Sequence, residues 1–168
     1  MKKVKELKKW IELYGEVHAA AEELELAYEY VKEEIITEEE VDAAYKKALH
    51  LLEDLEFRNM LRDEADQMSC VLKIISGAGG TESQDWASML MRMYQRWAEN
   101  NGYKISIANY QEGDEAGIKT VTFNIEGDYA YGYLKSENGV HRLVRVSPYN
   151  AQGKRMTSFA SVFVTPLV

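Results

Sequence analysis

The sequence contains a rigid polar tripeptide, Ser147-Pro148-Tyr149, with basic segments on both sides. Pro148 fixes its own φ at about −65° and biases the preceding Ser147 toward an extended backbone. We therefore expect the Ser147 hydroxyl to be presented at a defined angle on an exposed turn. A serine hydroxyl both donates and accepts hydrogen bonds. The flanking cations are Arg142, Arg145, Lys154 and Arg155. This combination predicts a loop that contacts nucleic acid.

A glycine-rich turn, Gly77-Ala78-Gly79-Gly80, precedes a predicted helix. It lacks the Gly-Lys-Ser/Thr ending of a nucleotide P-loop and the spacing of a dinucleotide-binding motif. Amides at a helix N-terminus attract hydrogen-bond acceptors. Glu82 would repel phosphate but suits the edge of a uracil, which offers carbonyl acceptors and an N–H donor. A tight strand-to-helix turn without a ligand is the alternative explanation.

Other reactive side chains are scattered. His141 with Arg142 and Arg145 suggests a nuclease only weakly, because no base and nucleophile occur at a telling spacing. Three His and one Cys give no metal-ligand pattern, so we expect no metal or cofactor. The lone Cys70 fits a reducing cytoplasm. The alternating tyrosines of 129–133 indicate a strand with core-facing rings more than a base-stacking platform.

Charge is distributed unevenly along the 168 residues. The net charge is −8, but residues 1–70 contain 10 Lys and Arg against 19 Asp and Glu, and residues 71–168 are close to neutral. Hydrophobic residues make up 46%, and no apolar run approaches the roughly 18 residues of a membrane span. The sequence thus predicts an acidic arm that binds protein and a body with one basic edge, without membrane association.

The acidic arm, residues 1–70, reads as two helices. Apolar residues recur every three or four positions over 4–31 and again over 41–61. Thr37 and Glu40 form a capping box that starts the second helix. A short connection between two such helices predicts an antiparallel hairpin.

Residues 71–168 predict an α+β domain with one long helix packed on a mainly antiparallel sheet. The helix covers 81–100, with Thr81 and Gln84 as a possible capping pair. Strands are expected at 70–75, 103–110, 118–126, 129–134, 140–146 and 157–165. The chain ends on strand-like residues 164–168, and we expect it to be part of a larger parent protein.

Several long motifs resemble bacterial class I peptide chain release factors, and among them the factors that read UAA and UGA. They cover essentially the whole chain and are specific: residues 78–90 (AGGTESQDWASML), 92–94 (RMY), 128–132 (DYAYG), 139–145 (GVHRLVR) and 157–159 (TSF). The resemblance implies binding to the ribosomal decoding centre, with its RNA and proteins, and to the mRNA stop codon.

The same resemblance implies roles for individual residues. Gly79 and Glu82 would read the first-position uridine. Ser147-Pro148-Tyr149 stands in the place of the Ser-Pro-Phe tripeptide that reads the second base. A hydroxyl that donates to guanine O6 or accepts from adenine N6–H tolerates both purines. Thr157 would contact the third base.

Two positions depart from the family pattern. Tyr149 replaces the usual Phe, and Met156 replaces a His that stacks between the second and third bases. The family's Gly-Gly-Gln loop, which promotes peptidyl-tRNA hydrolysis, has no counterpart, since Gly79-Gly80 is followed by Thr81. We therefore expect weak codon reading and no hydrolysis. A factor of altered codon range and a hairpin adaptor that binds only protein remain alternatives, and the sequence does not fix the oligomeric state.

Overall fold

The computed structural model describes residues 2–168. It divides into two compact units, Met1–Arg62 and Asp63–Val168. Residues 63–69, which the sequence assigns to the hairpin, pack in the second unit. There the carboxylate of Asp66 is buried against the Lys135 ammonium at 2.7 Å, and the Leu167 amide donates to the Ser69 carbonyl at 2.8 Å.

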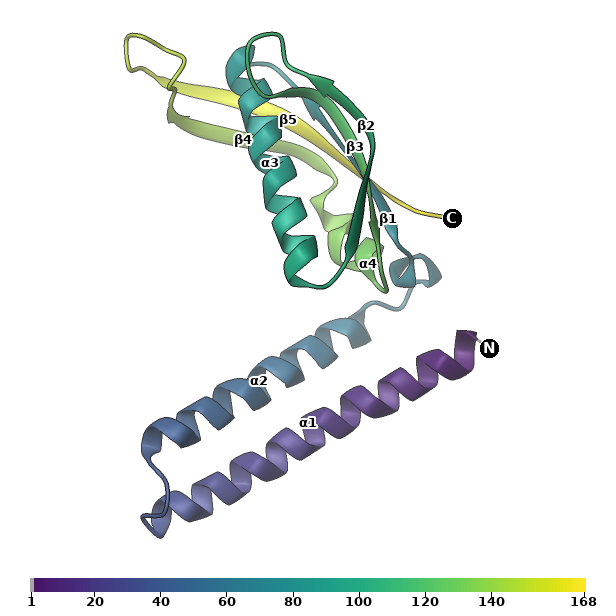
Figure 1. The fold of residues 1–168 in the computed structure, drawn as a ribbon, viewed down its shortest axis with the longest axis vertical. Coiled ribbons are helices and arrows are strands. Elements are labelled where there is room, and N and C mark those ends of the chain that lie inside the picture. Colours follow the sequence, from purple (N-terminus) through teal and green to yellow (C-terminus); the bar gives the residue numbers. More distant parts are fainter. Residues whose placement is uncertain (1) are drawn as a thin grey trace. The chain divides into compact units, whose positions relative to one another are not determined.

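The first unit is the predicted helical hairpin, formed by α1 (Lys2–Lys32) and α2 (Glu38–Met60) (Figure 1). The capping box is confirmed, because Thr37 Oγ1 accepts from the Glu40 amide at 3.4 Å and Glu40 Oε2 accepts from the Thr37 amide at 2.9 Å.

No helix among residues 2–168 is long and apolar enough to cross a membrane.

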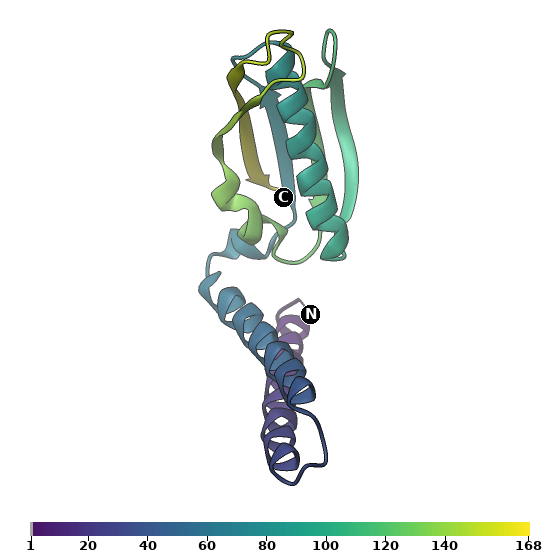
Figure 2. The same ribbon diagram turned by 90° about the vertical axis from the view of Figure 1, so that its left-hand side faces the viewer.

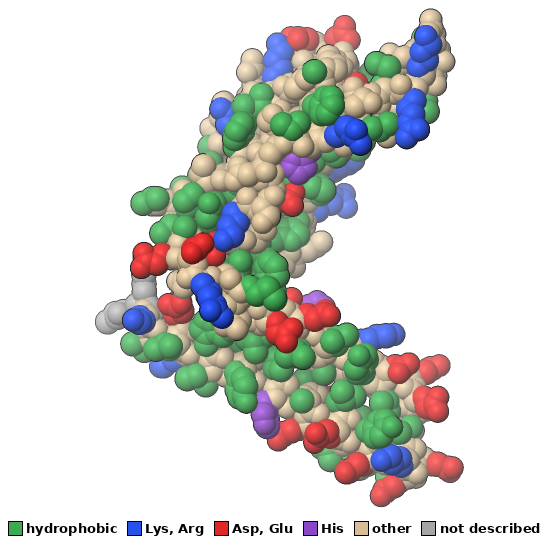
Figure 3. Space-filling model, turned by 180° about the vertical axis from the view of Figure 1, so that it is seen from behind, with side chains coloured by type: hydrophobic (Ala, Val, Ile, Leu, Met, Phe, Trp, Pro, Cys, Tyr) green, Lys and Arg blue, Asp and Glu red, His purple; other side chains and the backbone are tan. Residues whose placement is uncertain are grey.

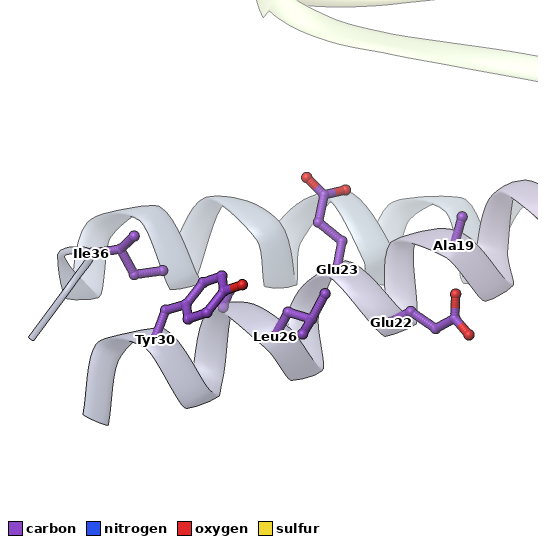
Figure 4. A pocket seen from close by; sticks show the side chains of 7 residues that line it. Ala19, Glu22, Glu23, Leu26, Tyr30 and Ile36 are labelled. Carbon is purple, nitrogen blue, oxygen red and sulfur yellow. The ribbon is translucent and has the colours of Figure 1, made fainter. Parts of the chain in front are cut away.

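The hairpin buries little of its apolar surface. Ala20 and Ala27 are the buried apolar residues of α1, and α2 buries none. A hollow of about 380 Å³ on the hairpin is lined mainly by apolar side chains, including Leu26 and Tyr30, together with Glu22 and Glu23 (Figure 4). An apolar surface with carboxylates suits a protein contact better than the phosphates of RNA.

The second unit is a five-stranded antiparallel sheet in the order β2-β3-β1-β5-β4. Its strands are β1 (Cys70–Ser76), β2 (Lys104–Glu112), β3 (Ile118–Glu126), β4 (Gly139–Val146) and β5 (Arg155–Pro166). A single long helix, α3 (Thr81–Asn100), lies along one face of the sheet (Figure 2). This arrangement confirms the predicted α+β fold.

The core lies between α3 and the sheet. The helix presents Ala87, Leu90, Tyr94 and Ala98, which recur every three or four residues and are buried. The strands contribute alternate residues, such as Leu72 and Ile74 of β1. The opposite face of the sheet carries the other set, including Lys73 and the half-exposed Phe163, which are cross-strand partners.

The strand predicted at 129–134 is wrong, since this segment forms the short helix α4 (Ala130–Leu134). Tyr129 has a φ of 65°, which interrupts any extended run after the turn at Gly127. The Tyr131 amide donates to the Met68 carbonyl at 3.0 Å instead of to a neighbouring strand. Ala130 and Leu134, one helical turn apart, are buried in the core. Two short 3-10 turns contact α4. Lys135–Glu137 follows it directly in the sequence, and Glu64–Gln67 packs against it from a distant part of the chain.

Truncating a core side chain of β1 should lower the free energy of unfolding much more than truncating a side chain on the open face of the same strand. Leu72 is fully buried in β1, whereas its neighbour Lys73 points to the exposed face. We expect Leu72→Ala to lower the free energy of unfolding by about 2–5 kcal/mol. Urea unfolding followed by tryptophan fluorescence measures this, with Lys73→Ala as the control. Equal losses in the two variants would contradict the described packing of α3 on the sheet.

Candidate nucleic-acid interface

The glycine-rich turn is fastened to β5 as it leads into α3. The Gly77 amide donates to the Phe159 carbonyl at 2.8 Å, and the Phe159 amide donates to the Ala78 carbonyl at 3.1 Å. Gly79 has a φ of +130°, and a Cβ at this residue would lie 2.8 Å from the Ser158 Cβ. Both the backbone conformation and the space beside β5 therefore favour glycine.

The predicted capping pair at the start of α3 is not formed. Gly80 is the N-cap residue, and Ser83 Oγ donates toward the carbonyls of Gly77 (2.9 Å) and Gly80 (2.7 Å). The Thr81 hydroxyl instead donates to the Glu115 carboxylate at 3.1 Å. Gly80 therefore provides no side-chain cap, and the amides of Ser83 and Gln84 donate to its carbonyl at 3.0 Å and 3.2 Å.

Glu82 lies at the centre of the site, with only 5% of its surface exposed. Its Oε1 accepts a hydrogen bond from Arg145 Nε at 2.5 Å, and its Oε2 accepts one from Ser147 Oγ at 2.6 Å. The Arg145 guanidinium lowers the pKa of Glu82; burial opposes this shift, and the Ser147 hydrogen bond adds to it. The carboxylate is therefore held in its charged form.

Arg145 joins two carboxylates of α3. Besides Glu82, its Nη2 donates to Asp85 Oδ2 at 2.5 Å, and these contacts raise the pKa of the guanidinium. Glu82 and Asp85 are three residues apart and so lie on one helix face. Removing the guanidinium would leave a buried carboxylate without its cation, which is strongly destabilising.

Two further contacts hold α3 against β4 and against the 3-10 turn that precedes it. Trp86 Nε1 donates to the His141 carbonyl at 3.0 Å, and the Tyr94 hydroxyl donates to the Glu137 carboxylate at 2.6 Å. Burial raises the pKa of Tyr94, and its hydrogen bond to Glu137 raises it further. The phenol therefore stays protonated and keeps donating, which fixes the helix position that Arg145 requires.

The tripeptide forms the tight turn that was predicted, but the Ser147 hydroxyl is not an exposed tip. The Asn150 amide donates to the Ser147 carbonyl at 3.3 Å across Pro148, and the Tyr149 amide donates to Ser147 Oγ at 3.1 Å. Ser147 is 5% exposed because its side chain turns inward to Glu82, whereas Pro148 and Tyr149 are exposed. The sequence did not reveal this acceptor, which lies on another element.

A pocket of about 460 Å³ forms where the turn meets the start of α3. It brings together five of the predicted site residues: Gly79, Glu82, Ser147, Tyr149 and Met156. The other residues of its lining are Thr81, Glu115, Asn150, Ala151 and Gln152. Pro148 shapes the turn without lining the pocket.

Thr157 is not part of this pocket. In the β4–β5 register Met156 pairs with Arg145, and Thr157 pairs with Val144. Successive residues of a strand face opposite sides of the sheet. Met156 thus lies on the face that carries α3, and Thr157 is exposed on the other face.

Sequence reasoning treated Arg145 only as one of several cations and did not single out Asp85. The sequence contained a signal for both residues. Arg145 lies two residues before Ser147, so strand alternation places their side chains on the same face, and Asp85 lies three residues after Glu82, which is about one turn of a helix. Figure 3 shows basic side chains on the projecting end of the β4–β5 hairpin, where Lys154 lies in the turn and Arg155 begins β5.

The residues suggested for nuclease chemistry do not share one site. Arg145 is paired with α3, whereas Arg142 is exposed and pairs across the sheet with Phe159. The ring of His141 contacts the Glu137 carbonyl at 2.9 Å.

Burial raises the pKa of Cys70 to about 12. Within residues 2–168, no cluster of three or more His, Cys, Asp or Glu side chains is arranged to hold a metal ion.

Comparisons with known proteins place these features in a family. Residues 1–162 match the model of the PCRF domain. The chain is 49% identical over 162 residues to peptide chain release factor 2 of Listeria innocua, which covers 92% of this chain and 44% of that protein. It is 48% identical over 165 residues to peptide chain release factor 2 of Nitratiruptor sp., covering 96% and 45%.

A solved structure described as RF2 of Thermus thermophilus resembles the model with a TM-score of 0.68 and 36% identity. The match covers 98% of this chain and 46% of that one. The chain therefore spans less than half the length of the relatives that it matches.

The two adjacent glycines at the start of α3 should differ in their tolerance of a side chain. Both have positive φ, but a Cβ at Gly80 meets nothing within 4 Å, whereas one at Gly79 meets Ser158. Gly80→Ala should cost roughly 1 kcal/mol of stability from backbone strain alone. We expect Gly79→Ala to cost more, as measured by urea unfolding. Equal costs would show that the turn moves away from β5 freely.

The buried carboxylate should make stability depend on pH. The pKa of Glu82 lies below its ordinary value of 4.5 in the folded protein, so the folded state binds fewer protons than the unfolded state as pH falls. Its contribution is present above that ordinary value and is lost as pH drops through the lowered pKa. Glu82→Gln should flatten this part of the stability–pH curve, whereas the exposed control Glu112→Gln should not. Parallel curves for wild type and Glu82→Gln would contradict the described network.

Proposed function

We propose that this chain, which belongs to the peptide chain release factor family, carries the part of a translation termination factor that reads UAA and UGA stop codons. The observation that carries the proposal is the 2.6 Å hydrogen bond between Ser147 and Glu82. It joins the predicted reader of the second base to the predicted reader of the first base in one pocket. The proposed partners are the ribosomal decoding centre and its mRNA codon, in the cytoplasm.

The first base is proposed to lie at the start of α3. The amides of Thr81 and Glu82 donate to the carbonyl oxygens of uracil, and the Glu82 carboxylate accepts from its N3–H. Cytosine has no N3–H and would place a lone pair against the carboxylate. Because Arg145 keeps Glu82 charged, the carboxylate acts as an acceptor only. This chemistry selects uridine.

The second base is proposed to meet the Ser147 hydroxyl. With adenine, the hydroxyl accepts from N6–H and keeps donating to Glu82. With guanine, it turns its hydrogen from Glu82 to O6. One side chain thus tolerates both purines, because a hydroxyl is both donor and acceptor. The guanine complex gives up the bond to Glu82, so we expect UGA to be bound less tightly than UAA.

The third base is proposed to be read separately. Met156 lines the pocket, but Thr157 lies on the other face of the sheet. A base at Thr157 is therefore reached across β5 and not beside the second base. This separation is the geometric support for treating the third position as a distinct contact.

Peptide release is proposed to need residues outside this chain. The chain contains no Gly-Gly-Gln sequence. We infer that it binds stop codons without hydrolysing peptidyl-tRNA. The replacement of the usual His by Met156, in the pocket itself, favours an altered codon range as the second candidate function.

Codon-dependent binding to ribosomes tests the proposal. Ribosomes programmed with UAA, UGA, UAG or the sense codon UGG are titrated with the fluorescently labelled chain, and peptidyl-tRNA hydrolysis is followed in parallel. We expect tighter binding to UAA and UGA than to UAG and UGG, and no hydrolysis. Ser147→Ala should weaken binding to both stop codons by roughly 5- to 10-fold, since it loses one hydrogen bond of about 1–1.5 kcal/mol.

Each of the other outcomes identifies a different function. Equal binding to all four codons would favour the protein-binding adaptor, and tight binding to UAG would favour the altered codon range. Release of the peptide by this chain alone would contradict the division between reading and hydrolysis.

A further inference from the structure

The start of α3 has no side-chain cap of its own. Its N-cap residue is Gly80, which has no side chain to accept from the first amides. The two residues that the sequence indicates as a capping pair, Thr81 and Gln84, are bonded elsewhere. The Thr81 hydroxyl donates to the Glu115 carboxylate at 3.1 Å, and Gln84 Oε1 accepts from the Asp114 amide at 3.3 Å. Both contacts lead to one segment, the loop between β2 and β3.

This β2–β3 loop, residues 113–117, lies directly against the first turn of α3. It joins its two strands at the end of the sheet where α3 begins (Figure 1). A Cβ at Gly117 would collide with the Gln84 carbonyl oxygen, so the backbone of the loop touches the backbone of the helix. Only a residue without a side chain keeps this contact.

The loop is itself held in one shape. The Gly113 amide donates to the Gly117 carbonyl at 2.9 Å, which closes the loop at its base. Lys119 of β3 pairs with the Asp114 carboxylate at 2.6 Å. The Asp114 amide and the Glu115 side chain are therefore presented to α3 from a braced segment. A segment that is already ordered loses little conformational entropy by holding the helix.

The first turn of α3 is also where the proposed contacts to the first base lie. The proposed donors to uracil are the amides of Thr81 and Glu82, and Thr81 is the residue that the loop holds through Glu115. Glu115 lines the pocket, so the loop reaches the space proposed for the base. A first turn that frays would present its amides in many directions, and such a turn would select uracil less well.

We propose that the β2–β3 loop takes the place of a helix cap and sets the direction of the amides that read the first codon base. Glu115 is a positioning residue, because it acts through the Thr81 hydroxyl and not on the base. The loop thereby governs the discrimination between uridine and cytidine at the first position and leaves the second position to Ser147. This inference rests on the proposed function, since it assigns a support to the same site.

Amide hydrogen exchange of the free chain tests the capping role without ribosomes. The amides of Ser83 and Gln84 donate to the Gly80 carbonyl, so their exchange reports opening of the first turn. Glu115→Ala should speed their exchange about three- to tenfold, because a hydrogen bond to a carboxylate is lost. Glu115→Gln, which keeps an acceptor for Thr81, should resemble wild type. Unchanged exchange at both amides in Glu115→Ala, or equally faster exchange at the core amides of β1, would overturn a local capping role.

Binding to ribosomes programmed with UAA, CAA or UGA tests the link to reading. Glu115→Ala should reduce the preference for UAA over CAA about three- to tenfold and leave the ratio between UAA and UGA unchanged. A chain that was only less stable would lose affinity for all three codons alike. The control is Glu112→Ala, which removes an exposed carboxylate at the end of β2 and should keep the wild-type preference.

A double-mutant cycle separates positioning from direct contact with the base. If Glu115 acts through Thr81, the losses of first-base preference from Glu115→Ala and Thr81→Val should not add. Thr81→Ser keeps the hydroxyl and should resemble wild type. Additive losses would mean that Glu115 meets the base itself and would overturn its positioning role.

The codon measurements also separate this inference from the proposed function. A Glu115→Ala chain that keeps the wild-type preference for UAA over CAA would overturn the role of the loop and leave the proposed function standing. Wild-type chain that binds UAA and CAA equally would instead overturn the proposed function, and the first-base role of the loop with it.

Discussion

The buried carboxylate of Glu82 is the contact on which the position of the β4–β5 hairpin depends. Glu82 is almost fully enclosed at the start of α3 and is charged, so it requires a cation and hydrogen-bond donors. Arg145 and Ser147 of the β4–β5 hairpin supply them at 2.5 Å and 2.6 Å. The helix and the hairpin are over sixty residues apart in sequence, yet this requirement places their ends side by side. The pocket forms at this position because the buried Glu82 carboxylate needs these two partners from the hairpin.

The rest of the second unit serves to keep that pairing in register. β4 is an edge strand, held on one side only by β5. The contacts from Trp86 and Tyr94 of α3 tie the β4 region to the helix, and the glycine turn is bonded to Phe159 of β5. A shift of one residue in β4 would turn Arg145 to the open face. Register and charge pairing therefore support each other.

The sequence predicted the elements that depend on local signals. The hairpin follows from its apolar period and from the Thr37–Glu40 capping box, and most strands follow from alternation. The segment 129–134 was misread because tyrosines at alternate positions suit a strand, whereas the left-handed Tyr129 and the amide bond to Met68 are tertiary features. The inward turn of Ser147 was missed for the same reason. Resemblance to a family assigned the pocket residues, but only the structure supplied Asp85 as a second carboxylate partner of Arg145.

Under the proposed function, the alternation of side chains along β5 would limit how one codon is read. Met156 and Thr157 are adjacent in sequence, but their side chains leave opposite faces of the strand. Under the proposed function, a codon that used both residues would have to pass its third base to the other side of β5, out of the stack formed by the first two. The two-residue period of the strand would then account for the unstacking, and the β4–β5 hairpin would separate two base sites.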